Sequence, residues 1–150
     1  MTRLTILLTV TAAAMTASAE AQQPRFDATY GQTTLEAGFE PNPLSVNLTA
    51  GGTVDASDLG DGCTGLIAIA PDFRIDYRAG GSALTIAADS VFDTVLVVHG
   101  PDGNWHCDDN GAGGNDPQIV FNGPAAGEYA IWVGAKDGDA RAVLEISEAR

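Results

Sequence analysis

The chain has few basic residues. Lys and Arg together number 7 against 20 Asp and Glu in 150 residues, which gives a formal net charge of −13 at pH 7. A protein with this charge repels nucleic acids and anionic membrane surfaces, because both carry dense negative charge. The acidic residues are spread along the chain rather than massed in one block, so no acidic disordered tail is predicted. Two explanations of the charge stay open: a solvated acidic surface, or bound cations.

A long apolar run is also missing. The best candidate, residues 4–10, is interrupted by Thr5 and Thr9, and it is too short to cross about 30 Å of hydrocarbon. It follows a positively charged start and precedes the small-residue site Ala19–Ala21, which is the pattern of a cleaved signal peptide. No twin arginine is present, so we expect a Sec-type signal at residues 1–21. The mature chain, residues 22–150, is then periplasmic or secreted and has no membrane span.

Cysteine occurs only twice, as Cys63 and Cys107. In an exported chain such a pair predicts a disulfide bond. The loop that it closes, about 45 residues, corresponds to about 4 kcal/mol of stabilisation in the chain-entropy model. Two buried free thiols are the alternative. A zinc site is disfavoured, because no CxxC pair occurs and only His99 and His106 could supply nitrogen ligands.

Helical periodicity is lacking after the signal peptide, and short strand patterns recur instead. Phe73, Ile75 and Tyr77 alternate with charged residues, which is typical of a half-buried strand. Residues 95–98 are continuously apolar, as in a central strand that is buried on both faces. The predicted strands lie at 32–39, 44–49, 53–57, 66–70, 73–78, 84–86, 94–98, 119–121, 129–133 and 142–146. We therefore expect an all-β fold, a single antiparallel β-sandwich with about eight to ten short strands.

The motifs of common hydrolases are missing as well. No serine stands in a Gly-Asp-Ser-Gly setting or in a G-x-S-x-G elbow. The Gly-rich residues 111–114 lack the Lys-Ser/Thr pair and the helix that a P-loop requires. His99 and His106 have no evident catalytic partners in the sequence. We predict that the chain is not an enzyme, and a hydrolytic or peptidase-associated protein is the alternative.

What the sequence does contain is one stretch, residues 93–116, that is rich in possible oxygen ligands. Glycines at 111, 113 and 114 let the backbone curl so that carbonyl groups can also point inward. Calcium prefers six to eight oxygen ligands on a pliable loop, which suggests a Ca²⁺ site here. The candidate ligands are Asp93, Asp108, Asp109, Asn110, Asn115 and Asp116. The alternative is a loop whose Asp and Asn side chains accept hydrogen bonds from its own backbone amides.

The two tryptophans, Trp105 and Trp132, allow two interpretations. Exposed aromatic rings on a sandwich can stack on sugars or anchor a partner protein. The alternative is packing in the core. We expect Trp132 to be partly buried, because it has the opposite parity to Tyr129, Ile131 and Val133. We expect Trp105 to pack against the predicted disulfide.

Three segments carry a family resemblance: GPDGNWHCDD at 100–109, NDPQI at 115–119 and AGEYAIWVG at 126–134. Together they resemble the bacterial pre-peptidase C-terminal domain, over about residues 72–147. The segments GFEPNP at 38–43 and CTGLI at 63–67 are similar to small stand-alone exported proteins that carry this domain. The resemblance implies a jelly-roll-like β-sandwich, often appended to secreted peptidases, without catalysis of its own. It also implies that calcium binding or adhesion to polymeric substrates occurs in some related domains.

The sequence therefore predicts an exported accessory domain that acts by binding, with a Ca²⁺-stabilised loop at residues 108–116 presenting the recognition surface. A carbohydrate-binding or adhesion module is a further alternative, with Trp105 and Trp132 as its candidate contacts. The expected partner is a protein or a polysaccharide, and no nucleic acid.

Overall fold

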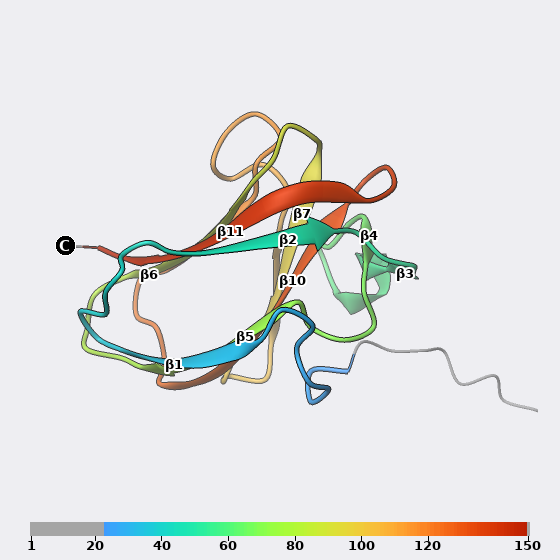
Figure 1. Cartoon of the computed structure of the whole chain (residues 1–150). Helices are drawn as coiled ribbons and strands as arrows, with labels where there is room; N and C mark the ends of the chain where they lie inside the picture. Colours follow the sequence, from blue (N-terminus) through green and yellow to red (C-terminus); the bar gives the residue numbers. More distant parts are fainter. Residues whose placement is uncertain (1–22, 150) are drawn as a thin grey trace, which may run out of the picture.

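The computed structural model describes residues 23–149, so the predicted signal peptide lies outside the described residues. Within this range the chain forms eleven strands and one short 3-10 helix. The strands build two sheets that pack face to face, which confirms the predicted all-β sandwich (Figure 1). No helix in the described part is long and apolar enough to cross a membrane.

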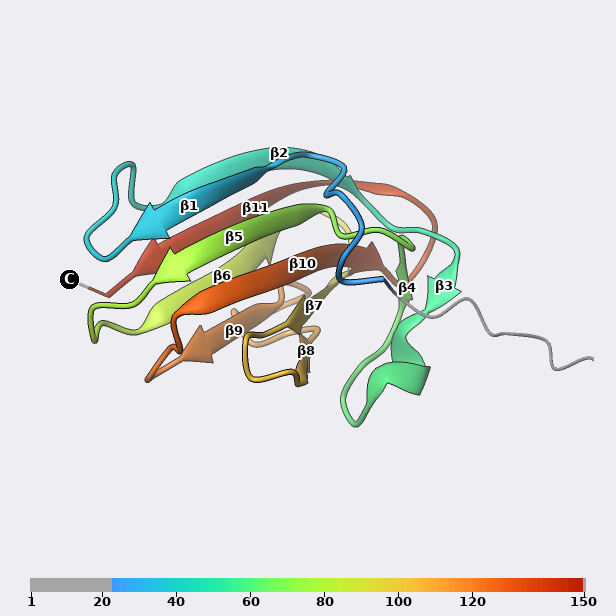
Figure 2. The ribbon, with the colours of Figure 1, turned by 90° about the horizontal axis from the view of Figure 1, so that it is seen from below.

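The smaller sheet has the order β2-β11-β6-β9 and is antiparallel throughout. Its four strands lie side by side in the view from below (Figure 2). Their bounds are β2 Leu44–Ala50, β11 Ala140–Glu148, β6 Leu84–Asp89 and β9 Gln118–Phe121.

The larger sheet is organised around β10, which spans Gly127–Ala135. One edge of β10 pairs with β5 (Phe73–Arg78) and then with β4 (Leu66–Ile67). The other edge pairs with β7 (Thr94–His99), which in turn pairs with β8 (Trp105–Asp108). Two short outer strands complete the sheet, β1 (Gln32–Glu36) beside β5 and β3 (Val54–Asp55) beside β4.

Two details of the sheets differ from the sequence prediction. β1 runs parallel to β5, whereas all pairs were expected to be antiparallel. The chain between them passes through the other sheet, so no hairpin forces the two strands to be antiparallel. β8 was not predicted at all, because Trp105–Asp108 has no alternation of apolar and polar residues.

The main core fills the space between the sheets. Tyr129, Ile131 and Val133 of β10 point into it, and they meet inward side chains such as Ile86 and Leu144 from the smaller sheet. These five side chains are at most 1% exposed. The side-chain period of two along β10 therefore places one apolar row on this face of the larger sheet.

A second apolar cluster covers the opposite face of the larger sheet. It contains Trp132, Val95, Val97 and Ile67 from the sheet, and Ala56 and Cys63 from the segment that crosses over it. That segment, which we call the cover, is residues 56–65, between β3 and β4, and it includes the 3-10 helix Ala56–Leu59. Residues 95–98 are thus buried on both faces, as predicted. The expectation for Trp132 was wrong: it is fully buried, because the cover closes the face on which it lies.

Candidate functional site

The predicted disulfide is present. Cys63 of the cover is bonded to Cys107 of β8, with a Cα–Cα distance of 5.0 Å. Trp105 packs against the apolar cluster that contains Cys63. The bond holds the cover on the larger sheet and fixes the start of the acidic stretch that follows β8.

Asp108 closes the loop that follows it. One carboxylate oxygen, Oδ2, accepts hydrogen bonds from the backbone amides of Asn110 (3.1 Å), Gly111 (2.6 Å) and Gln118 (2.8 Å). These bonds join the two ends of the loop at residues 109–117. Asp108 therefore fits the alternative interpretation of this stretch, in which Asp and Asn side chains accept hydrogen bonds from the backbone amides of their own loop.

Lys136, from the turn between β10 and β11, lies between two of the predicted ligands. Its Nζ is 2.8 Å from Asp109 Oδ2 and 3.8 Å from Asp93 Oδ2. The hydrogen bond to Asp109 raises the pKa of Lys136, and the charge of Asp93 adds to the effect. A fourth candidate, Asp116, accepts a hydrogen bond from the backbone amide of Ser90 at 3.2 Å.

The six candidate ligands thus lie in neighbouring loops, but the four carboxylates are occupied by N–H groups or by Lys136. Asn110 and Asn115 contribute backbone carbonyls to the loop, which accept from the amides of Gly113 and Thr94. In residues 23–149, no group of three or more His, Cys, Asp or Glu side chains is arranged to hold a metal ion. The calcium site stays a prediction.

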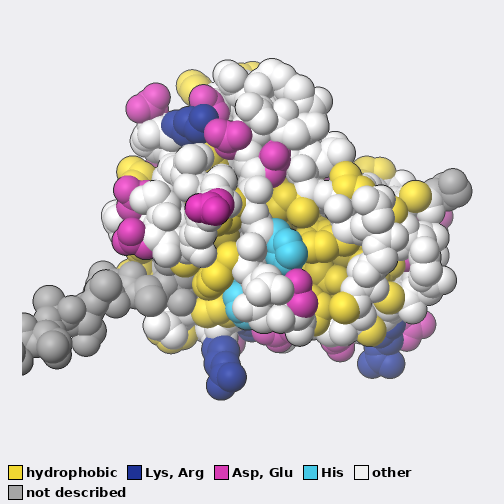
Figure 3. Space-filling model, turned by 180° about the vertical axis from the view of Figure 1, so that it is seen from behind, with side chains coloured by type: hydrophobic (Ala, Val, Ile, Leu, Met, Phe, Trp, Pro, Cys, Tyr) yellow, Lys and Arg dark blue, Asp and Glu magenta, His cyan; other side chains and the backbone are white. Residues whose placement is uncertain are grey.

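Three loops meet at this end of the sandwich, in the upper part of Figure 1: residues 90–93, 109–117 and 136–139. The amide of Lys136 donates to the carbonyl of Asp93 at 3.1 Å, and the amide of Thr94 donates to the carbonyl of Asn115 at 3.4 Å. We call these loops and their flanking residues 89 and 140–141 the acidic end. Its aspartates are Asp89, Asp93, Asp109, Asp116, Asp137 and Asp139, against the bases Lys136 and Arg141. Figure 3 shows acidic side chains gathered around a basic one in this part of the surface.

Two apolar side chains project from the acidic end. Val91 is 90% exposed and Phe92 is 56% exposed, in the turn between β6 and β7. The turn itself is held in place, because Ser90 Oγ donates to the carbonyl of Arg141 (2.8 Å) and accepts from the amide of Phe92 (3.1 Å). An apolar pair is therefore presented to solvent on a turn of defined geometry.

The histidines have structural partners. The ring of His99 packs edge-on against Trp105, and the ring of His106 packs against Phe121. His106 Nε2 lies 3.1 Å from Asp102 Oδ2. Desolvation raises the pKa of Asp102, but the hydrogen bonds from Asn104 and then the contact with His106 together outweigh it, so the pKa is lowered. No serine or threonine hydroxyl in the described part of the chain is hydrogen-bonded to either histidine. The geometry required for a Ser-His nucleophile is not formed by these residues.

The tryptophans do not form an exposed platform. Trp132 is fully buried, and the half-buried Trp105 packs against it in a tilted arrangement with ring centroids 5.3 Å apart. The other neighbour of Trp105 is His99, 4.7 Å away. The carbohydrate-binding alternative, which required at least one of these two rings on an open face, loses its predicted contacts.

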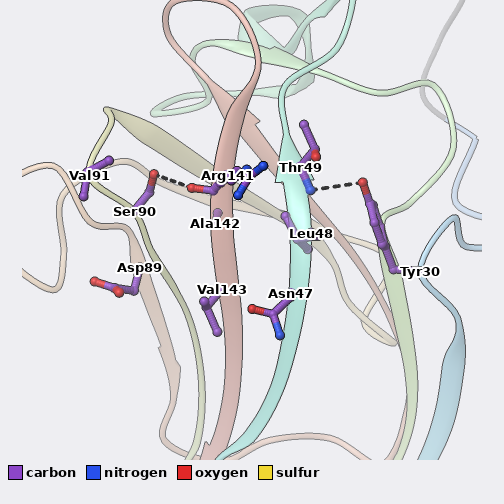
Figure 4. A pocket seen from close by; sticks show the side chains of 10 residues that line it. All are labelled: Tyr30, Asn47, Leu48, Thr49, Asp89, Ser90, Val91, Arg141, Ala142 and Val143. Atoms are coloured by element: carbon purple, nitrogen blue, oxygen red, sulfur yellow. Dashed lines mark hydrogen bonds between the residues drawn. The ribbon is translucent and has the colours of Figure 1, made fainter.

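Sequence reasoning missed a groove beside the acidic end. It has a volume of about 540 Å³ and crosses β6, β11 and β2 of the smaller sheet (Figure 4). Tyr30 lies at one side of the groove and Val91 at the other. The alternation in residues 44–49 places Asn47 and Thr49 on the solvent face of β2, but the sequence pattern does not show that Tyr30 lies beside them.

Comparison with known proteins supports the family resemblance. The family model of the bacterial pre-peptidase C-terminal domain matches residues 72–135, from just before β5 to the end of β10. This domain type is non-catalytic, which agrees with the prediction that the chain is not an enzyme. No curated protein matches the chain. Among solved structures, the chain is similar to PliG of Aeromonas hydrophila, described as a periplasmic lysozyme inhibitor of g-type lysozyme. The identity is 18%, the TM-score is 0.40, and the match covers 79% of this chain and 97% of PliG.

Proposed function

We propose that this chain is an exported, non-catalytic β-sandwich domain that binds a basic partner protein through its acidic end. The observation that carries the proposal is the exposure of Val91 and Phe92 on a turn surrounded by aspartates. The match of residues 72–135 to a non-catalytic domain supports binding rather than chemistry.

The exposed apolar pair has no role in folding that the structure reveals. Turns that connect strands normally use Gly, Asn, Asp or Ser, because these residues suit the backbone and are well solvated. Val91 and Phe92 instead leave most of their apolar surface in water. Protein interfaces typically combine an apolar or aromatic centre with a polar rim, and this arrangement is present here.

The charge of the acidic end indicates the chemistry of the partner. The aspartates there outnumber Lys136 and Arg141, and the whole chain carries −13. A negative field of this kind accelerates encounter with a basic protein and disfavours acidic ones. The Ca²⁺-stabilised loop predicted at residues 108–116 is a separate hypothesis, and the surface described here does not require the ion.

Site-specific photo-crosslinking tests the proposal. A photoreactive phenylalanine analogue replaces Phe92 in one variant and Phe26 in the other, and the full chain is produced in its native host. Phe26 is a matched control, because its exposure of 50% is close to the 56% of Phe92. It belongs to the segment at the opposite end of the molecule (Figure 1). We expect a discrete adduct with a basic protein at position 92 and none at position 26.

Binding is then measured with the purified partner. Phe92→Ser is expected to weaken the affinity by about tenfold or more, as for a central interface residue, while the melting temperature stays unchanged because the side chain is exposed. Affinity should also fall as salt is added. Equal adducts at positions 92 and 26, an acidic partner, or wild-type affinity of Phe92→Ser would each overturn the proposal.

A further inference from the structure

The groove on the smaller sheet is a candidate site that is separate from the exposed ring of Phe92. Its wall and floor include Tyr30, Asn47, Thr49, Asp89, Val91 and Arg141. Figure 4 shows them around an open trough that crosses β11 and β2, with Tyr30 on one side and the turn at Ser90–Val91 on the other. Its volume of about 540 Å³ lies within the range typical of ligand sites.

Tyr30 supplies a ring in a defined orientation. Its hydroxyl accepts a hydrogen bond from the backbone amide of Thr49 at 3.0 Å, so the ring is held beside β2. The side chain is seen edge-on in Figure 4, with one face turned toward Leu48 and Thr49. The residue is 37% exposed. A fixed and accessible aromatic face is suited to stacking on a flat ligand surface that carries C–H groups.

The rest of the groove offers hydrogen-bond donors and acceptors of several kinds. Asn47 has an amide, Asp89 has a carboxylate, and Arg141 has a guanidinium with five N–H donors. The backbone of Arg141 is held by the hydroxyl of Ser90, which donates to its carbonyl. The groove thus combines an apolar ring face with both classes of hydrogen-bonding group, none of which is deeply buried.

We propose that this groove binds a segment of a neutral polysaccharide. A sugar ring presents a C–H face that can stack on Tyr30, and its hydroxyls both donate and accept, as Asn47, Asp89 and Arg141 require. An anionic polymer is disfavoured by the net charge of −13. An added peptide strand is disfavoured beside Thr49, because the outward amide of that residue is already bonded to Tyr30.

The site goes beyond the proposed function, since it takes another class of ligand and centres on Tyr30 and Asn47, although it shares Asp89, Val91 and Arg141 with the acidic end. The probes are cellohexaose and hexa-N-acetylchitohexaose, titrated into the full mature chain by calorimetry and by two-dimensional NMR. We expect saturable binding of at least one of them, with chemical shift changes centred on Tyr30, Asn47 and Arg141. Phe92→Ser should bind the glycan like the wild type, so that failure of one proposal is distinguishable from failure of the other.

Three variants give the test its contrast. Tyr30→Ala is expected to weaken glycan binding by about fivefold or more, because the stacking face is lost. Tyr30→Phe keeps the ring but loses the hydrogen bond that orients it, so its effect should be smaller than that of Tyr30→Ala. Phe26→Ala removes a ring that is more exposed than Tyr30 and does not line the groove, and it should bind normally. No saturable binding of either probe, or wild-type binding by Tyr30→Ala, overturns the proposal. Loss of protein partner binding in Tyr30→Ala, with no glycan binding in the wild type, would assign the groove to the protein instead.

Discussion

Asp72 is a carboxylic acid buried at the edge of the core, 3% exposed. The pairing of β5 with β10 ends at Phe73 and Ile131, so the amide of Val133 has no strand partner on that side. Asp72 Oδ2 accepts a hydrogen bond from this amide at 2.7 Å. Burial raises the pKa of Asp72 to about 7, and the hydrogen bond from Val133 lowers it only in part. The carboxyl group is therefore easier to protonate in the folded chain than in the unfolded one.

This shift predicts a pH dependence of stability with a defined sign. A folded-state pKa above the unfolded value of 3.8 means that the folded chain binds more protons between pH 4 and 7. The contribution of Asp72 is fully present below pH 3.8 and is lost as the pH rises through about 7. Asp72→Asn keeps an acceptor for Val133 and cannot ionise, so we expect it to be more stable than the wild type at pH 8 and no more stable at pH 4.

Urea denaturation of the wild type and of Asp72→Asn at several pH values measures the two free energies of unfolding. The difference between these free energies isolates the effect of Asp72 from that of the other carboxylates. A constant difference from pH 4 to pH 8 would show that the carboxyl group titrates alike in the folded and unfolded chain.

At the scale of single elements, the loop at residues 109–117 depends on Asp108. Asp108→Ala leaves the amides of Asn110, Gly111 and Gln118 without their acceptor, and we expect a loss of about 2 kcal/mol in the free energy of unfolding. Because these bonds and Lys136 already occupy the carboxylates, EGTA should leave the melting temperature of the wild type unchanged. Asn104→Ala, in the exposed turn after β7, is a control for a lost loop residue.

Thermal melts of metal-stripped protein, with and without added calcium, decide this prediction. A midpoint that falls in EGTA and recovers with calcium would contradict it and would establish the calcium hypothesis for residues 108–116.

The cover is the element that depends on the disulfide. Replacing Cys63 and Cys107 by serine removes a link between residues 44 positions apart, and the expected cost is about 2–4 kcal/mol. The main core lies on the other face of the sheet, so far-UV circular dichroism should change little. The fluorescence of Trp132 should shift to the red, because the cover is what shields it from water.

The emission spectrum and the urea midpoint of the double variant check this. An unshifted spectrum together with wild-type stability would mean that the cover is held on the sheet without the bond.

The elements that sequence reasoning located are those whose pattern is local. Residues 95–98 are continuously apolar, and they form the centre of β7, buried on both faces. β8 escaped notice because its residues are all half-buried, which produces no periodic pattern. Trp132 was misjudged for a non-local reason: its burial depends on a segment about 70 residues earlier in the chain, which no window around β10 contains.

For the molecule as a whole, features that depend on local sequence were likewise predicted, whereas features that depend on contacts between distant segments were not. The disulfide and the sandwich follow from cysteine count and strand spacing, and both are confirmed. The sequence placed six candidate ligands in one stretch, but it did not predict their contacts, because Lys136 and Ser90 approach Asp109, Asp93 and Asp116 only through tertiary structure. The groove beside Tyr30 is likewise formed by segments that are distant in sequence.

The net charge of −13 is the property that belongs to no single element, and it leads to a prediction about salt. Ion pairs within the described residues involve Arg74, His106 and Lys136, and in each pair at least one partner is well exposed. Exposed pairs contribute about 0.2–1 kcal/mol each, so screening them costs little. Screening the repulsion among many like charges should gain more, because the compact state concentrates them.

We therefore expect the folded chain to become more stable as NaCl rises from about 10 mM to about 0.5 M, over which the screening length falls from about 30 Å to a few ångströms. Urea denaturation measures this without adding ions. The triple variant Asp89→Asn, Asp137→Asn, Asp139→Asn removes charge from the acidic end without touching the pairs of Lys136, so its stability should rise less steeply with salt. A wild-type midpoint that falls with salt would mean that the few ion pairs outweigh the repulsion. An equal slope in the triple variant would place that repulsion outside the acidic end.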